Sequence, residues 1–548
     1  MKTSIIILAY DKLDYTKLCI ESIRKYTNPG EYEIIVAGEK PNIDTKSWFK
    51  EQNDIVTIFN EDNMKFSRVI NDGIKIASGD NILLLDNDTV VTPRWLDNLT
   101  TCLYNLKKNG AVGAVTNSGP YYQVIDAACK NVDEAADFAE QYNRSNPDLW
   151  EEKLRLNGFC LLIKKEVIDK VGLLDERFTP GICEADDYSF RIRIAGYSLV
   201  LCKDTFIYHF NTNIFNYQLI VENEKKFEEK WKFNLRYSTG VRQEIINLID
   251  TPKDKKINVL EIGCACGGTL LKIRDIYKNA DIYGIELNIG AAQIAQSFAE
   301  IKKGDIENEP LDYPDNFFDY IIFADVLEHL NNPWVVLTNI KKCIKPEGCV
   351  LASIPNIMHY SVLRGLINGY WTYEEAGILD RTHLRFFTLN EIDKMFKDTG
   401  YQILACFWTL LYKTAADENF ISQLNELTGK NLTSQYEAYQ YIIKAKNIAG
   451  VEDTLSKALT ETNIKEDKNA NRDLKFLLRR IENGVKTQES MEKVIELINN
   501  KKYMDDIVAV IMNDIIEREK IISLVWLECC KYGLFDNAME LRKKYHAY

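Results

Sequence analysis

The chain has 548 residues, several times the usual length of one domain, so two to four domains are expected. Its composition, 46% hydrophobic and 27% charged, is that of a folded globular protein and argues against extensive disorder. The net charge of −13 argues against nucleic acid as a partner, because phosphates attract basic surfaces. The apolar run at residues 5–9 is too short for a membrane span or a secretion signal, so we expect a cytoplasmic protein without a transmembrane segment.

Short β-branched runs alternate with helical stretches over residues 3–210, which is typical of an α/β fold. The predicted strands are residues 4–8, 33–36, 81–85 and 199–202, and the predicted helices are residues 15–26 and 68–77. The strand at 81–85 is apolar on both faces, as a central strand should be, and it ends at Asp86. The carboxylates that follow it therefore lie at the edge of the sheet where α/β proteins bind ligands.

A polar, proline-containing stretch at 251–256 separates this segment from a second α/β alternation that continues to about residue 412. Its predicted strands are residues 257–262, 281–286, 318–324 and 349–354. Beyond residue 414 the apolar residues follow a heptad-like spacing without a clear strand, so that region is predicted to be helical. We therefore predict three domains, at residues 1–240, 241–412 and 413–548.

Asp86 and Asp88 stand two residues apart at the end of the central strand. Two carboxylates in this arrangement can hold a divalent cation, which can in turn bridge both phosphates of a nucleotide diphosphate-sugar. The cation offsets the negative charge that develops on the leaving diphosphate. Taken alone, the same pattern also fits a solvated turn or a helix N-cap.

Three segments in order resemble the family 2 glycosyltransferases over residues 1–235: SIIILAYDKLDYTKLCIESI, NEDNMKFSRVINDGIKIASGDNILLLDNDTVVTPRWL and GLLDERFTPGICEADDYSFRIRIAGYSL. The resemblance implies a GT-A fold, Mg²⁺ or Mn²⁺, and transfer with inversion at the anomeric carbon. It implies nucleotide-sugar contacts from Tyr10, Glu39, Asn71, Asp86 and Asp88. It also implies that His209 is a third metal ligand, whereas the alternative for His209 is a packed residue at a strand end.

An acidic cluster at residues 184–187 matches the position from which this family takes its general base. The common form of the family has Asp where this chain has Ala185, so Glu184, Asp186 and Asp187 are all candidates, with Glu184 and Asp187 favoured. The alternative is an acidic run that stabilises a helix N-terminus. Many relatives contact the nucleobase through an Asp after the second strand, where this chain offers Glu39 instead, so UDP- and dTDP-sugars are both candidate donors.

The strand at 257–262 breaks into a turn that contains Gly263 and Gly267, and a helix follows. Glycine allows a ligand to approach the backbone closely. Glu286 closes the next strand, where an acid can accept hydrogen bonds from ribose hydroxyls, and Asp305 is placed to meet an adenine amine. A dinucleotide such as NAD is the rival ligand for this pattern.

Together with FDYIIFADVLEHL and KPEGCVLASIPN, these elements resemble the class I S-adenosylmethionine methyltransferases over residues 256–412, against the NAD interpretation. The resemblance implies a Rossmann-like domain. The cofactor-binding residues that it implies are Glu261, Gly263, Gly267, Glu286, Asp305 and Asp325.

Methyl transfer to a sugar hydroxyl requires in-line alignment and the removal of one proton, a task that suits a histidine of pKa about 6.5. His329, His359 and His383 all follow strand ends, and we expect His383 or His329 to be the catalytic base; a structural role is the alternative for each. Tyr370, Trp371 and Tyr373 are candidates either for an apolar platform under a sugar or for the core.

The two resemblances together predict a bifunctional enzyme that adds a sugar to a glycan or glycoprotein acceptor and O-methylates it. Such fusions suggest a bacterial surface polysaccharide or flagellin as the acceptor. The alternative is that one domain has decayed and the protein acts as a single-activity transferase with a scaffold role, an idea motivated by Ala185. The helical tail is expected to form a homodimer or to recruit the acceptor.

Overall fold

The computed structural model describes residues 1–9, 12–39, 41–60, 66–119, 121–178, 183–210, 217–448, 470–482, 487–499, 504–515, 518–531 and 534–547. The chain divides into two compact units. The N-terminal unit contains Met1–Val241, Ala265–Ile276 and Asn288–Lys303, and the C-terminal unit contains Arg242–Cys264, Tyr277–Leu287 and Gly304–Tyr548. Within the described ranges, every helix is too short or too polar to cross a membrane.

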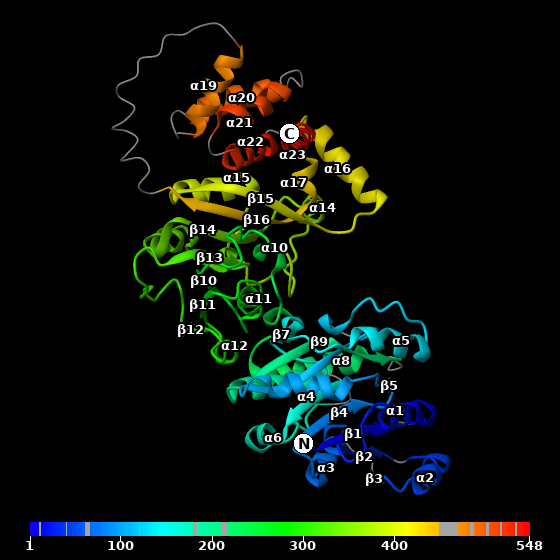
Figure 1. Cartoon of the computed structure of the whole chain (residues 1–548). Coiled ribbons are helices and arrows are strands. Elements are labelled where there is room, and N and C mark those ends of the chain that lie inside the picture. Colours follow the sequence, from blue (N-terminus) through cyan, green and yellow to red (C-terminus); the bar gives the residue numbers. More distant parts are fainter. Residues whose placement is uncertain are drawn as a thin grey trace. The chain divides into compact units, whose positions relative to one another are not determined.

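The N-terminal unit is built on a mixed sheet with the strand order β3-β2-β1-β4-β8-β6-β9-β5, and β7 also pairs with β9 (Figure 1). The strands are β1 Thr3–Ala9, β2 Tyr32–Glu39, β3 Ile55–Asn60, β4 Asn81–Asp86, β5 Thr89–Val90, β6 Asn109–Thr116, β7 Trp150–Lys153, β8 Cys160–Lys164 and β9 Ser198–His209. Strands β1 to β4 are parallel to one another, whereas β8 runs antiparallel to both β4 and β6. The carboxyl end of β4 therefore lies in the middle of the sheet.

Helices cover both faces of this sheet, and alternate strand residues divide between the two cores. Ile5, Ile7 and Leu83 pack with side chains of α1 and α4, whereas Ile6 and Leu84 pack on the opposite face with side chains of α3, α6 and α7. The helices are α1 Leu13–Tyr26, α2 Ile43–Lys50, α3 Phe66–Ile76, α4 Trp95–Asn105, α5 Val132–Tyr142, α6 Lys165–Val171, α7 Glu184–Ile194, α8 Tyr217–Trp231 and α9 Leu235–Ser238, with 3-10 turns at η1 Tyr121–Gln123 and η2 Pro147–Leu149.

A third core of the N-terminal unit joins segments that are far apart in the sequence. Phe190 of α7 and Phe227 of α8 pack in one buried cluster with Leu271 of α11 (Gly268–Ile276) and Ile294 of α12 (Ile289–Ala295). An ionic network supports the same region, because buried Glu151 pairs with lysines from three different elements. These lysines are Lys153, Lys203 and Lys272.

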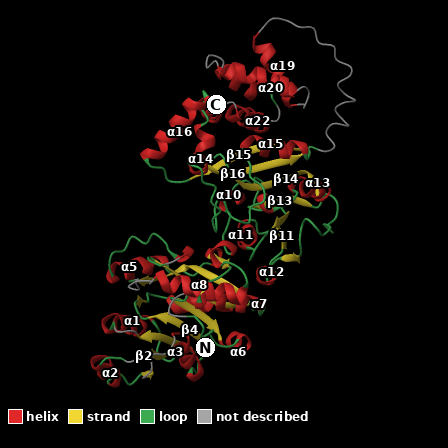
Figure 2. Ribbon diagram, turned by 180° about the vertical axis from the view of Figure 1, so that it is seen from behind, coloured by secondary structure: helices red, strands yellow, loops and turns green. Residues whose placement is uncertain are grey.

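The C-terminal unit contains a second sheet, in which the strands β11-β10-β13-β14-β16-β15 follow one another. The strands are β10 Ile257–Ile262, β11 Ala280–Glu286, β13 Phe318–Ala324, β14 Ile344–Pro355, β15 Tyr401–Leu410 and β16 Ala438–Asn447; β12 is Glu300–Lys303. Strands β11, β10, β13 and β14 are parallel, and β16 runs antiparallel to both β14 and β15. Figure 2 shows these strands with helices at their margins.

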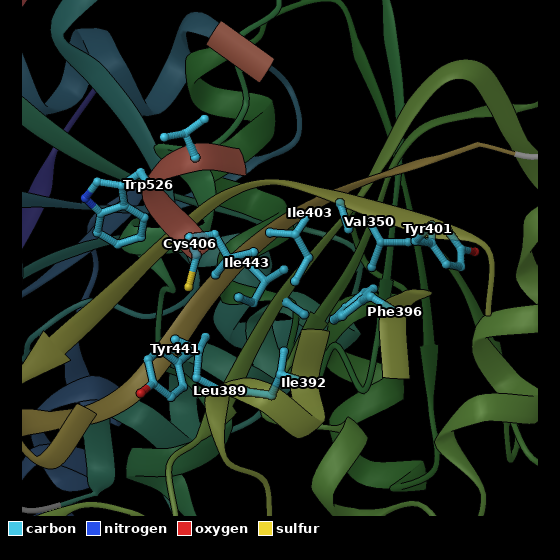
Figure 3. Packing of buried hydrophobic residues seen from close by; sticks show 14 of the residues in the cluster. Val350, Leu389, Ile392, Phe396, Tyr401, Ile403, Cys406, Tyr441, Ile443 and Trp526 are labelled. Carbon is cyan, nitrogen blue, oxygen red and sulfur yellow. The ribbon is translucent and has the colours of Figure 1, made fainter. Parts of the chain in front are cut away.

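Helices after residue 415 form a layer on the edge strand β15. The helices of this unit are α10 Gln243–Ile246, α13 Pro333–Ile340, α14 Tyr360–Ile367, α15 Leu389–Asp398, α16 Ala415–Thr428, α17 Thr433–Glu437, α19 Ala470–Glu482, α20 Thr487–Asn499, α21 Met504–Asp514, α22 Arg518–Lys531 and α23 Phe535–Ala547, with 3-10 turns at η3 Leu327–His329 and η4 Lys341–Cys343. Trp526 of α22 stacks on Trp408 of β15 with ring centroids 5.3 Å apart. Figure 3 shows Trp526 at the end of a buried layer that includes Cys406 and Ile443. The apolar face of the tail is thus used within the chain, and the homodimer stays a prediction.

All of the predicted strands are present, as are the predicted helices α1 and α3. The prediction that residues 413–548 are helical is confirmed for the helices but wrong for Ala438–Asn447, which is the strand β16. This segment is buried on both faces between β14 and β15, so its sequence shows no regular alternation of apolar and polar residues. The predicted domain boundaries at 240 and 412 remain predictions.

We expect Trp526→Ala to release the helical layer from β15. Trp526 is 5% exposed, and truncation of a buried tryptophan costs about 3–5 kcal/mol. Hydrogen exchange should therefore quicken in α22 and β15 while the N-terminal unit keeps its protection. Met539→Ala in α23, where the side chain is 48% exposed, is the matched control and should change little. Equal protection in both variants would show that the stacked tryptophans do not hold the tail.

Candidate functional site

The first site lies where β4 ends and β9 ends. Asp86 is the last residue of β4, and the two-residue strand β5 follows Asp88 directly. Strand β5 pairs antiparallel with β9 so that Thr89 lies opposite His209, and the Phe210 N–H donates to the Asp88 carbonyl at 3.0 Å. Backbone pairing thus brings His209 to the two aspartates across more than a hundred residues of sequence.

The tautomer of His209 follows from its contacts. Its Nδ1 lies 3.1 Å from the carbonyl oxygen of Ser118, which can only accept, so Nδ1 carries the proton. Its Nε2 faces Asp88 Oδ1 at 3.1 Å and Asp86 Oδ2 at 4.0 Å. Asn117 fixes the position, because its side chain exchanges two hydrogen bonds with the backbone of His209. The imidazole lone pair therefore points at two carboxylates, an arrangement that calls for a proton or a cation between them.

The charges of this cluster shift the pKa of its members. Burial would lower the pKa of His209, but the hydrogen bond to Asp88 and the charge of Asp86 outweigh it and raise that pKa. Burial and the neighbouring Asp88 raise the pKa of Asp86 to about 6, against the effect of His209. One donor atom from each of the three residues lies within 4.8 Å of the other two. Two carboxylates and one imidazole with a free lone pair fit a divalent cation such as Mn²⁺ or Mg²⁺.

The three acidic residues of α7 have different surroundings. Asp187 is fully buried and is held by the Trp231 Nε1–H at 2.9 Å, the guanidinium of Arg191 at 2.9 Å, and the ammonium of Lys230. Asp186 pairs with Arg155 at 2.6 Å. Glu184, 5% exposed, begins the helix after Cys183, whose backbone is left-handed at φ 68°. Asp187 thus has a structural partner set, and the choice of the general base remains a prediction.

The other residues predicted to contact the nucleotide-sugar are Asn71, Glu39 and Tyr10. The side-chain amide of Asn71 accepts a hydrogen bond from the Leu174 N–H at 2.9 Å and donates one to the Leu174 carbonyl at 3.0 Å. These two bonds hold α3 against the segment that follows α6. This favours a role for Asn71 in the fold, which the sequence analysis does not predict. Glu39 is the last residue of β2, opposite Asn60 of β3. Tyr10 lies outside the described residues.

The second site lies at the carboxyl ends of β10, β11 and β13. Gly263 follows β10 with φ +67°, its N–H donates to the Ile285 carbonyl at 2.8 Å, and a Cβ on it would lie 2.7 Å from Cγ2 of Val326. Only glycine fits this turn. Glu286, 9% exposed, ends β11, and its carbonyl accepts from the Gly304 N–H at 3.1 Å. The turn, the acid and the segment after β12 therefore meet at one edge of the sheet.

The remaining predicted cofactor residues have partners in the fold. Asp305 accepts from the Glu307 N–H at 2.9 Å and from the Asn308 amide at 2.8 Å, so both of its oxygens support a local turn. Asp325, at φ 56°, is held by Ser353, Gln440 and Arg242. Glu261 is buried in β10, and Gly267 has φ +79°. Their roles in binding a cofactor stay predictions.

His329 and His383 lie together, with ring centroids 4.7 Å apart. His329 ends the 3-10 turn η3 after β13, and the Leu384 N–H and Arg385 N–H both donate to the carbonyl of Glu328, which fixes the two segments side by side. Burial lowers the pKa of His329, with a further contribution from His383, and burial raises the pKa of Glu328 to about 8. Glu328 was not among the residues predicted from the sequence. The adjacent Glu and His in DVLEHL were the pattern that could have indicated it.

The structure distinguishes the buried His359 from the exposed aromatic residues after α14. His359 is 1% exposed and caps α14 through Nδ1, and burial lowers its pKa to about 4, so it is a poor proton acceptor at neutral pH. Tyr370, Trp371 and Tyr373 are 68%, 38% and 49% exposed, which excludes the core alternative. Trp371 packs on Phe386, whose ring lies 6.4 Å from that of His383. An exposed aromatic group thus borders the histidine pair.

Two family models match the chain in the same order as the two sites. Residues 4–165 match the family described as Glycosyl transferase family 2, and residues 234–405 match the family described as Methyltransferase domain. The chain carries a family 2 glycosyl transferase domain and a methyltransferase domain. The predicted fold classes, GT-A followed by Rossmann-like and then helices after residue 415, are thereby confirmed, as are the two enzyme classes.

Curated relatives match short parts of the chain. A phosphoethanolamine N-methyltransferase from Triticum aestivum is 32% identical over 124 residues, which are 21% of this chain and 24% of that protein. A ubiquinone biosynthesis O-methyltransferase from Rickettsia canadensis is 24% identical over 152 residues, 27% of this chain and 64% of that protein. The chain thus spans about a quarter of the phosphoethanolamine methyltransferases that it matches.

Solved structures are similar to parts of the chain at low identity. A mannosyltransferase from Pyrobaculum calidifontis, in complex with GDP-Man and Mn²⁺, is 15% identical over 38% of this chain and 56% of its own, with a TM-score of 0.30. A SAM-dependent methyltransferase from Archaeoglobus fulgidus is 18% identical over 41% of this chain and 99% of its own, also with a TM-score of 0.30.

We expect Asp187→Asn to destabilise the N-terminal unit, because it removes the buried counter-charge of Arg191 and leaves Lys230 paired with Asp175 alone. Removing one partner of a buried pair costs about 3–5 kcal/mol, and the 21% exposure of both cations places the loss near the lower end. Thermal denaturation of the full chain measures it. Asp169→Asn, which removes a 61% exposed partner of Lys165, should change little. A shift as small as that of Asp169→Asn would show that Asp187 is not a structural anchor.

Proposed function

We propose that the protein transfers a sugar from a nucleotide-diphosphate donor to an acceptor and transfers a methyl group from S-adenosylmethionine to a hydroxyl of the product. The observation that carries the first activity is the His209 lone pair that faces Asp86 and Asp88 at the strand ends. The glycine turn and Glu286 at the neighbouring strand ends of the second sheet support the methyl donor site. The two family matches support the combination.

In the first step, Asp86, Asp88 and His209 would hold a divalent cation that supplies positive charge to the diphosphate of the donor. The pairing of β5 with β9 keeps the three side chains in place before the donor binds. We propose a UDP- or dTDP-linked sugar as the donor. Inversion at the anomeric carbon follows from direct displacement, in which the acceptor hydroxyl attacks that carbon, the nucleoside diphosphate leaves, and one acidic residue accepts the hydroxyl proton.

We propose Glu184 as this base. Asp187 is held by Arg191, Lys230 and Trp231, and Asp186 is held by Arg155. These ion pairs hold the carboxylates of Asp186 and Asp187 in fixed orientations, away from an incoming hydroxyl. Glu184 begins α7 and is one of the two acids that the family resemblance favours.

In the second step, Glu286 would accept hydrogen bonds from the ribose of S-adenosylmethionine, which supplies an electrophilic methyl group. The cluster of His329 and His383 would receive the acceptor hydroxyl and its proton. Tyr370, Trp371 and Tyr373 would contact the apolar face of the sugar, because all three are exposed and Trp371 packs on Phe386, which lies beside His383. The acceptor is proposed to be a glycan or glycoprotein, such as flagellin or a surface polysaccharide.

The test of both activities uses purified protein with a panel of nucleotide sugars, a glycan acceptor and labelled S-adenosylmethionine, followed by mass spectrometry of the products. Wild-type protein should give a glycosylated and methylated product. Asp88→Ala should lose glycosylation. Gly263→Ala should bind the methyl donor at least about tenfold more weakly, because the new Cβ would collide with Val326.

Gly369→Ala is the control for Gly263→Ala. Gly369 also has positive φ, +83°, but nothing lies within 4 Å of its would-be Cβ, so this variant carries the backbone strain without the collision. Sugar transfer without methylation, or methylation without sugar transfer, by wild-type protein would leave one activity and support the scaffold alternative. Absence of both would refute the proposed function.

Glu184→Gln should lower kcat for sugar transfer by about 10²–10⁴-fold, because it removes the carboxylate that accepts the proton. The melting temperature should not change, because glutamine has nearly the same size and shape as glutamate. Initial rates at saturating donor and acceptor provide the measurement. Asp186→Asn is compared in parallel. If Glu184→Gln keeps its rate while Asp186→Asn loses it, the base is Asp186 and our assignment is wrong.

A further inference from the structure

Glu328, His329 and His383 form a cluster in the C-terminal unit, apart from the aspartates of the first site. One ligand-type atom from each of the three residues lies within 4.8 Å of the other two. The backbone determines this placement, because the Leu384 N–H at 2.8 Å and the Arg385 N–H at 3.0 Å both donate to the carbonyl of Glu328. The three side chains are thus held close together without depending on contacts between themselves.

Both imidazoles have the same tautomer. His329 Nδ1 lies 3.2 Å from the carbonyl oxygen of Thr382, and His383 Nδ1 lies 2.9 Å from the carbonyl oxygen of Ile378. A carbonyl oxygen only accepts, so each Nδ1 carries its proton and each Nε2 keeps a lone pair. Histidines that bind metals are oriented in this way, with the second nitrogen donating to a carbonyl or carboxylate.

The carboxyl group of Glu328 has no such support. The residue is 1% exposed, and within the described part of the chain no other residue donates a hydrogen bond to either of its oxygens. The Arg242 guanidinium is paired with Asp325. A buried carboxyl group that forms no hydrogen bond with another residue is costly whether it is charged or neutral, and each such group in a folded protein needs a physical explanation. A cation next to Glu328 would provide it.

We propose that Glu328, His329 and His383 bind a divalent transition-metal ion, with Zn²⁺ as the best match. Two imidazoles and one carboxylate form a three-ligand zinc set that leaves one position open, and imidazole favours such ions over Mg²⁺. Ligand atoms around tetrahedral zinc lie roughly 3.3 Å apart, so the cluster must close by at most about 1.5 Å. His329 is only partly buried, which leaves the cluster accessible from solvent.

A cation at this position would lower the pKa of an acceptor hydroxyl that approaches the open position, so that the hydroxyl proton is released to water. With the metal bound, this replaces the transfer of the proton to a histidine. This consequence rests on the proposed methyl transfer. Binding of the metal does not, because it is measured without S-adenosylmethionine or acceptor. A failed methylation assay and a failed binding assay are therefore distinguishable.

The experiment uses metal-free full-length protein that carries Asp88→Ala, which disables the first metal site. Zn²⁺ is titrated by calorimetry, and Co²⁺ is titrated by visible absorption, which reports imidazole coordination. We expect one equivalent of each metal. Adding His383→Ala should weaken Zn²⁺ binding at least about 100-fold, and adding Glu328→Gln should weaken it at least about tenfold.

Two comparisons guard against loss of folding. Glu328→Gln keeps the volume of the side chain and removes the buried charge, so its circular dichroism and melting temperature without metal should match those of the parent protein. His359→Ala removes another buried histidine that follows a strand end outside the cluster, and it should keep Zn²⁺ affinity. Absence of a Zn²⁺ equivalent in the parent protein, or equal affinity in His383→Ala and His359→Ala, overturns the proposal.

Discussion

The first site depends on one electrostatic constraint. The imidazole of His209 faces the buried carboxylate of Asp88 and the half-buried carboxylate of Asp86. Because the Ser118 carbonyl accepts a hydrogen bond from Nδ1–H of His209, the Nε2 lone pair of the neutral imidazole faces Asp88 Oδ1 at 3.1 Å. Such a contact is repulsive unless positive charge enters it. The pairing of β5 with β9 and the clamp from Asn117 prevent the side chains from turning away. The fold therefore creates an affinity for positive charge at the carboxyl end of β4.

The strands that support this site could be predicted because their sequences are strongly patterned. Residues 81–85 are apolar throughout and stop at a carboxylate, which identifies a central strand and its functional end. Strand β16 was missed because it is buried between two neighbours that are distant in sequence, and its Lys444 is buried as well. A segment of this kind shows neither the two-residue period nor the long apolar run on which prediction relies.

The site residues also divide into those whose placement follows from local sequence and those whose contacts come from distant parts of the chain. The positions of Asp86, Asp88 and Gly263 at strand ends could be predicted from local sequence, since each follows a strongly patterned strand. Local sequence could not identify the contacts of Asp187 with Lys230 and Trp231 of α8, or the contact of Asn71 with Leu174, because these residues lie far apart in the chain. A carboxylate at a helix start looks the same in sequence whether it accepts a proton or balances a buried lysine. Only the tertiary contacts distinguish the two roles.

The shared aromatic core of the N-terminal unit has a consequence for synthesis on the ribosome. Phe190 and Phe227 are translated well before Leu271 and Ile294, which complete their cluster. At roughly 5–20 residues per second, the nascent chain exposes this surface for several seconds after the first sheet can form. The sheet would leave the ribosome with an apolar surface that is exposed until Leu271 and Ile294 are synthesised and pack on it. A nascent chain that stopped near residue 240 would keep that surface exposed. The fusion thus couples the maturation of the transferase sheet to the arrival of segments that precede and follow the methyltransferase strand β11.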